Sequence, residues 1–164
     1  MQQREVIINN DAPVPVGLEA PAVAATGTIT CGQVADGNTV TIDDGVHTAV
    51  TFEFDNNETT TPGNIAVAFA ASGGVSAANL LIAINAQATL DVTATATDPA
   101  SATINLTNDT AGAAGNVAIT KVGAPITVTG MAGGLDAVSL YTLAAQLGAM
   151  TTAINDLVTA LETP

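Results

Sequence analysis

The sequence predicts a mainly β fold: a β-sandwich-like α+β domain with one packed helix, an extended N-terminal arm and a C-terminal oligomerising helix. Three observations predict it. Short runs of Thr, Val, Ile and Phe, separated by Gly, Asn and Asp, fill residues 26–134. Prolines interrupt the apolar residues of 1–25, which are typical of an extended arm. A heptad pattern of apolar residues runs through 138–162, as in a coiled-coil helix.

The arm begins with "EVIIN" and continues through Pro13 and Pro15. Proline fixes its own φ angle, lacks an N–H donor and favours an extended conformation in the preceding residue. An apolar, extended segment outside a domain is either a flexible tether or a strand that pairs with a neighbouring sheet. We expect docking on another chain, through Val6, Ile7, Ile8, Val14 and Val16.

Eight segments of the β domain are strand candidates. They read "GTITC", "NTVTID", "TAVTFEFD", "NIAVAF", "LDVTATA", "SATINLT", "NVAITK" and "PITVTG". In "TAVTFEFD", Val50, Phe52 and Phe54 share one face while Thr51 and Glu53 share the other, which indicates a half-buried strand.

The turns and a central helix complete the domain. "ADGN" and "DDGV" contain Asp-Gly pairs, which tolerate positive φ and favour tight hairpins. Near residues 76–88, "SAANLLIAINAQA" places Leu80, Leu81, Ile84 and Ala88 on one side of a helix, with Ser76 as its N-cap. We expect this helix to pack across one sheet face.

The closing segment fills every a and d position of three consecutive heptads. Position a holds Leu140, Leu147, Ile154 and Leu161, and position d holds Leu143, Met150 and Leu157. A helix that lies on its own domain usually has a wider apolar face, so the narrow seam indicates oligomerisation. The seam is widened at e and g by Ala144, Ala153, Val158 and Ala160. This favours three or more helices, although the a and d residues alone leave dimer and trimer open, and folding back onto the sheet is the alternative.

Charge restricts the partners. Two Lys+Arg residues stand against fifteen Asp+Glu residues, a formal net charge of -13, which repels a nucleic-acid backbone. We expect no nucleic-acid partner and no membrane span, because Pro and Gly interrupt the long uncharged stretch of residues 59–90. The start shows no Sec-type signal. Cys31 is the single cysteine and is expected to be a small buried hydrophobe.

The sequence offers little for catalysis, and we expect no enzyme, cofactor or metal. His47 is the single histidine and has neither a second histidine nor a nucleophile motif beside it. A weaker hypothesis is a metal-dependent hydrolase that uses His47 with Asp43, Asp44 and Asp55. Calcium is a further alternative to plain solvated turns for the carboxylates Asp36, Asp43, Asp44, Asp55 and Glu58.

The middle of the chain resembles a known kind of module. "VADGNTVTIDDGVHTAVTFEFD", "SAANLLIAINA", "VTATATDPASATINLTNDTAGAAGNVAIT" and "VTGMAGG" resemble a β-rich module of tailed-bacteriophage virion proteins, found in fibre and head-surface components. "VIINNDAPVPV" is similar to the short N-terminal arms of small phage head and neck proteins. The resemblance implies a virion structural protein without enzymatic activity.

Together these observations favour a capsid decoration, or cement, protein. It would be made in the host cytoplasm, form a homotrimer and bind the major capsid protein on the outside of the virion, using the arm on the capsid or a neighbouring copy. The alternative is a short head or tail fibre protein that contacts the host surface. No repeated shaft follows the module and no aromatic-rich tip is present, which is unlike a long host-recognition fibre.

Overall fold

The structure is a computed structural model that describes residues 19–162, with the side chains of residues 19, 139–144 and 162 outside the description. The arm residues Val6, Ile7, Ile8, Val14 and Val16 therefore lie outside the described residues. The chain divides into two compact units, and each is described by itself. We call Ala22–Ala137 the β unit, and Met1–Pro21 with Val138–Pro164 the helical unit.

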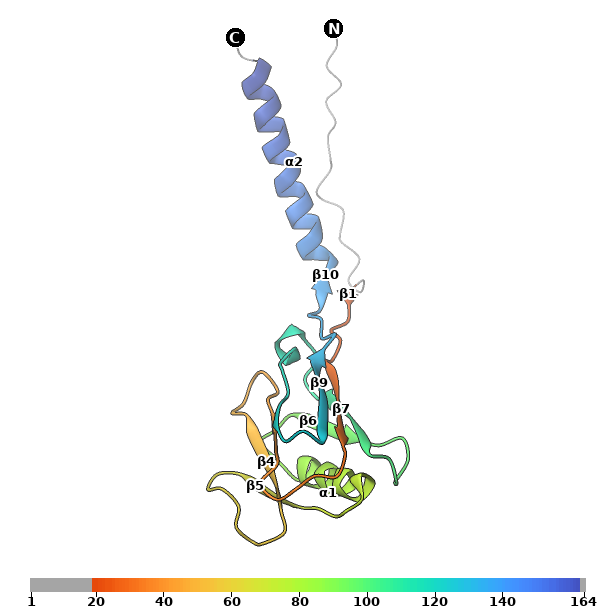
Figure 1. The fold of residues 1–164 in the computed structure, drawn as a ribbon. Coiled ribbons are helices and arrows are strands. Elements are labelled where there is room, and N and C mark those ends of the chain that lie inside the picture. The colour runs from red at the N-terminus through yellow and green to blue at the C-terminus, as the bar shows by residue number, and fades with distance from the viewer. Residues whose placement is uncertain (1–18, 163–164) are drawn as a thin grey trace. The chain divides into compact units, whose positions relative to one another are not determined.

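The β unit contains a strand in each of the eight expected segments, although the strand in "NVAITK" begins only at Thr120. The eight strands are β2 (Thr26–Cys31), β3 (Thr39–Ile42), β4 (Val50–Asp55), β5 (Ile65–Ala68), β6 (Val92–Thr95), β7 (Thr103–Asn108), β8 (Thr120–Val122) and β9 (Ile126–Ala132). The helix α1 (Gly73–Asn85) lies between β5 and β6, and the short 3-10 helix η1 (Ala113–Gly115) follows β7. The chain is thus mainly β, as the sequence predicts (Figure 1).

The strands form two four-stranded sheets. One has the order β6-β7-β2-β9 and is antiparallel throughout. The other has the order β5-β4-β3-β8, in which only β4 and β5 run parallel. Along β2 and β7, buried residues alternate with more exposed ones, because successive side chains of a strand point to opposite faces of the sheet.

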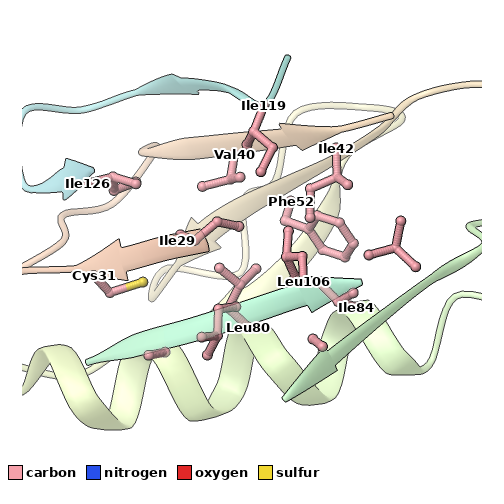
Figure 2. Close-up of a cluster of buried hydrophobic side chains, with 14 of the residues drawn as sticks. Ile29, Cys31, Val40, Ile42, Phe52, Leu80, Ile84, Leu106, Ile119 and Ile126 are labelled. Carbon is pink, nitrogen blue, oxygen red and sulfur yellow. The ribbon is translucent and has the colours of Figure 1, made fainter. Parts of the chain in front are cut away.

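One core cluster joins residues of both sheets and α1. Figure 2 shows Leu80 and Ile84 of α1 pointing toward Ile29, Leu106 and their neighbours on the strands. Each of these four side chains is fully buried. The helix contacts β2, β6 and β7 of the first sheet and also β5 of the second. It therefore packs against strands of both sheets, whereas the sequence predicted packing across one sheet face.

The start of α1 differs from the expected position. The helix begins at Gly73, with Ser72 as its N-cap, while Ser76 is buried within the first turn. The Ser76 hydroxyl donates to the Ser72 carbonyl at 3.2 Å. Glycine allows this early start, because a Cβ on Gly73 would overlap the carbonyl oxygen of Cys31. The N-cap prediction for Ser76 is wrong.

The two Asp-Gly turns adopt the predicted backbone but not the predicted connections. Gly37 and Gly45 have φ angles of +76° and +81°. However, "ADGN" connects β2 to β3, which belong to different sheets, so it closes no hairpin. "DDGV" lies in residues 43–49, a longer loop between the antiparallel strands β3 and β4. A Cβ on Gly45 would overlap the Ala114 carbonyl, so this loop requires glycine.

The helical unit contains a short strand pair and the long helix. Strand β1 (Glu19–Ala20) pairs antiparallel with β10 (Val138–Ser139), which the sequence did not predict. The helix α2 (Leu140–Glu162) follows β10 directly and has 23 residues. Within residues 19–162, neither helix is both long and apolar enough to span a membrane.

Candidate interaction surfaces

The apolar stripe of α2 is exposed in the single chain. Leu147, Met150, Ile154 and Leu157 have exposed fractions between 57% and 63%, and Leu161 reaches 77%. These five predicted interface residues occupy successive a and d positions, and we call them the α2 seam. The two other predicted interface residues, Leu140 and Leu143, belong to α2, but their side chains lie outside the description.

The flanks of the seam, at positions e and g, are uncharged, and all of them except Gln146 are small. Val158 is 47% exposed at position e. Thr151, also at e, donates its hydroxyl to the Leu147 carbonyl at 3.0 Å, and Thr152 donates to the Gly148 carbonyl at 3.1 Å. Because these hydroxyls are bonded to the helix itself, the methyl group of Thr151 remains available for packing. The charged residues of α2 are Asp156 and Glu162, both at positions outside a, d, e and g.

The outer face of the sheet β6-β7-β2-β9 is covered by threonine. Its residues, which we call the threonine face, are Thr26, Thr28, Thr30, Thr93, Thr95, Thr103, Asn105, Thr107, Thr127 and Thr129. They align across the strands, so that Thr28 lies beside Asn105 on one side and Thr129 on the other. A depression of about 350 Å³ lies at these three residues. None of the ten residues is charged.

A buried carboxylate links the two sheets. Asp44 follows β3 and accepts the backbone N–H groups of Val46 and His47 on Oδ1, at 2.8 and 2.7 Å. Its Oδ2 accepts the Asp91 N–H at 2.9 Å and lies 2.8 Å from His47 Nδ1. Asn108 Nδ2 donates to the Asp44 carbonyl at 2.8 Å. Since Asp91 precedes β6 and Asn108 ends β7, this Asp44 cluster joins one sheet to the other.

The hydrogen bonds set the protonation of the Asp44 cluster. Burial would raise the pKa of Asp44, but the N–H groups of His47, Asp91 and Val46, together with the His47 ring, hold it well below its usual range. The hydrogen bond to Asp44 and the charges of Asp44 and Asp91 raise the pKa of His47. The pair is therefore a carboxylate beside an imidazole that gains protons readily.

Of the residues that the hydrolase hypothesis grouped together, the structure places Asp44 beside His47. Among the described residues, the one set of three donors close enough to share an ion is Asp44, His47 and Asp91, whose donor atoms lie within 4.8 Å of one another. Asp43 and Asp55 are not in that set. Both Asp44 oxygens already accept two hydrogen bonds, so the cluster works as a structural connection between loops.

Three further carboxylates, those of Asp36, Glu53 and Asp55, are also held by nearby donors. Asp55 accepts the Thr60 hydroxyl at 2.7 Å, and Asp36 accepts Asn57 Nδ2 at 2.6 Å. The Asn64 amide bonds Glu53 at 2.6 Å and, with Thr61, lowers the pKa of Glu53. These bonds order the loops around β4 and β5.

Cys31 is almost completely buried, at 1% exposure, as the sequence predicted. Burial raises the pKa of its thiol to about 11. A thiol with so little thiolate and so little access to solvent is chemically inert. This residue belongs to the core of the β unit.

Comparisons with known proteins assign no relative: no family model, no curated protein and no solved structure matches the chain. Sequence reasoning missed the threonine face, although the alternation of Thr or Asn with apolar residues in "TGTIT" and "TINLT" is its signal. It also missed Asp91, because nothing local marks a residue whose role depends on a loop more than 40 positions away.

Proposed function

We propose that the protein is a phage capsid decoration (cement) protein that assembles through α2 and stabilises the shell by non-covalent contacts. The observation that carries the proposal is the exposed α2 seam. Fully covering one Leu, Ile or Met side chain contributes about 1.5–3 kcal/mol, so five such side chains provide a substantial driving force for association. The second support is the resemblance of the β segments to phage head-surface modules.

Assembly into an oligomer would strengthen the binding of such a protein to a capsid shell. Linked copies bind neighbouring sites with an effective concentration that raises avidity about 10²- to 10⁴-fold over one copy. A ligand that binds the assembled shell and not its separated subunits stabilises the assembled state by mass action. The net charge of -13 keeps the protein from competing for the packaged DNA.

Two surfaces of this chain serve as contacts to the shell in this proposal. The first is the arm, whose apolar residues Val6, Ile7, Ile8, Val14 and Val16 add strand-like contacts to the major capsid protein or a neighbouring copy. The second is the threonine face, because the cores of protein interfaces are depleted of charged residues. Its β-branched side chains are also stiff and lose little freedom on binding. We assign it to an uncharged surface of the major capsid protein.

The same proposal includes the finer architecture of the β unit. The two sheets would pack face to face as a β-sandwich, with α1 closing one side of the core. Their shared cluster of buried residues supports this arrangement.

The test is co-sedimentation of the protein with purified phage heads that lack decoration. Full-length protein is expected to bind, and Thr107→Asp on the threonine face is expected to weaken binding tenfold or more. Thr120→Asp on β8 adds the same charge at another exposed threonine and is expected to bind normally. Failure of the full-length protein to bind heads contradicts the proposal.

A short head or tail fibre protein is the second candidate. The depression at Thr28, Asn105 and Thr129 favours it, since hydroxyl and amide groups within its mainly apolar lining can bind neutral saccharides by hydrogen bonds. This function predicts binding of the protein to host cells or to their surface glycans. Binding to cells without binding to heads would favour the fibre over the decoration protein.

A further inference from the structure

We infer that two further copies of this chain cover the α2 seam, in a parallel three-stranded coiled coil that also buries its flanking positions. The seam is one continuous surface, since its five side chains recur at alternating steps of three and four residues. A 23-residue helix is about 35 Å long, so the seam is long enough for successive knob-into-hole layers.

A second copy fits the seam because the seam is complementary to itself. Each a or d side chain enters a hole formed by four residues of the facing helix, and an identical helix supplies such holes at the same intervals. Partners of other kinds need a matching heptad or a groove of the same length. The heptad spacing of the seam therefore favours a helix with the same heptad repeat.

The flanks decide the number of copies. Positions e and g between residues 144 and 160 are Ala144, Gln146, Thr151, Ala153, Val158 and Ala160. In a two-stranded coil these positions face water and commonly hold Glu or Lys. Here one of the six, Gln146, is long and polar, and the hydroxyl of Thr151 is already bonded to the helix. Three is the smallest number of helices that covers both the seam and its flanks.

Symmetry decides the orientation. Three identical chains in a closed ring are related by a threefold axis, which leaves all three helices pointing the same way. The seam has no polar residue at a or d, and its flanks have no charged residue at e or g. No side chain there therefore enforces a parallel or antiparallel orientation. The orientation therefore follows from the closed assembly.

The inference concerns the protein alone and does not require a phage head. The solution mass of the purified chain tests it, while co-sedimentation with heads tests the proposed function. A trimer that does not bind heads would retain this inference and reject that function. A dimer that binds heads would reject this inference and retain that function.

The first experiment measures the mass of the full chain by light scattering. We expect three chains for the wild type, one chain for Leu157→Asp and three chains for Thr152→Asp, which adds the same charge at position f. Thermal unfolding of the β unit should be equal in both variants, which separates loss of assembly from misfolding. A wild type of one, two or four chains overturns the inference, as does a Leu157→Asp variant that remains assembled.

The second experiment tests orientation by cross-linking of Leu157→Cys under mild oxidation. In a parallel coil, the three Leu157 positions lie around the axis within disulfide distance. Because three thiols allow one disulfide, at most two of every three chains should run as cross-linked dimers. Cys31 does not interfere, since it is buried.

Thr152→Cys is the matched control, and its thiol at position f should remain uncross-linked. Complete conversion of Leu157→Cys to dimers would indicate a two-stranded parallel coil and contradict three strands. Absence of cross-linking, with assembly intact, would indicate antiparallel helices and contradict the orientation.

Discussion

The β unit and α2 use the same apolar residue types in opposite ways. Ile29 and Leu80 in the β unit have no exposed surface, whereas Ile154 and Leu157 in α2 are 57% and 62% exposed. The β unit thus completes its core within one chain. The apolar side chains of α2 gain nothing by facing water, and their spacing fits copies of the same helix. The difference separates apolar residues that stabilise the fold of one chain from apolar residues that we propose to bind other copies of the chain.

The strongest test of this difference compares Phe52→Ala with Ile154→Ala. Phe52 is fully buried in the core cluster (Figure 2), so its truncation should leave a cavity. We expect the free energy of unfolding of the β unit to fall by about 3–5 kcal/mol, measured by denaturant titration. Ile154→Ala should leave that value unchanged and weaken assembly, measured by light scattering over a dilution series.

The outcome that would remove the distinction is a similar loss of β-unit stability in both variants. In that case α2 would be part of the core of its own chain. The converse result, with assembly lost only in Phe52→Ala, would move the association surface to the β unit.

A smaller effect is expected from the connection between the sheets. Asp44→Ala leaves the Val46, His47 and Asp91 N–H groups without their acceptor. Val46 and His47 are exposed residues, so water can replace the acceptor that their N–H groups lose, and the total cost should be about 1–3 kcal/mol. We expect a lower free energy of unfolding for the β unit and no change in the mass of the assembly.

Asp43→Ala is the matched control for Asp44→Ala. The Asp43 carboxylate accepts one N–H group, that of Gly45, at an exposed site. Its removal should cost less than that of Asp44. Equal losses would show that the buried position and multiple donors of Asp44 do not matter.

The strands were predictable from the sequence because their signal is local. In "TGTIT" and "TINLT", every second residue is Gly, Ile or Leu and every other one is Thr or Asn, and the structure buries the Gly, Ile and Leu residues. The heptad spacing of the C-terminal segment likewise predicted α2. Such patterns involve residues close together in the sequence, so they can be recognised without knowledge of the fold.

The missed features depend on contacts between distant residues. Val23 and Leu135 form a bridge that joins the two ends of the β unit, and β1 pairs with β10 in the helical unit. Each involves only one or two residues per strand, too few for a period-two pattern to appear. The early start of α1 also depends on close backbone contact of Gly73 with Cys31, which no helix-start rule contains.

The stability of the β unit should depend on pH through two of its groups, His47 and Asp44. The pKa of His47 is raised in the folded chain, so its stabilisation is complete below the unfolded value near 6.5 and is lost as pH rises through the folded value. The pKa of Asp44 is lowered, so its contribution is lost as pH falls below about 3.8.

His47→Gln isolates the histidine, because glutamine keeps a hydrogen-bond donor and does not titrate. We expect the advantage of the wild type over this variant, measured by thermal unfolding, to shrink as pH rises above about 6.5. A difference that stays constant between acidic and alkaline pH would contradict the role of the Asp44–His47 pair. Asp91 is the other charged group near the ring, at 4.0 Å.

The smallest expected effect is that of salt, which acts on charge rather than on apolar contacts. The β unit contains one lysine, Lys121, and ten carboxylates: Asp36, Asp43, Asp44, Glu53, Asp55, Glu58, Asp91, Asp98, Asp109 and Asp136. The repulsion among these carboxylates should weaken as salt shortens the screening length. We expect NaCl to raise the unfolding temperature of the Leu157→Asp variant, in which α2 assembly is removed. Sucrose is the control, because it strengthens burial without screening charge. If sucrose raises the unfolding temperature as much as NaCl does, the effect of NaCl arises from stronger burial of the core. In that case the acidic surface does not measurably lower the stability of the β unit.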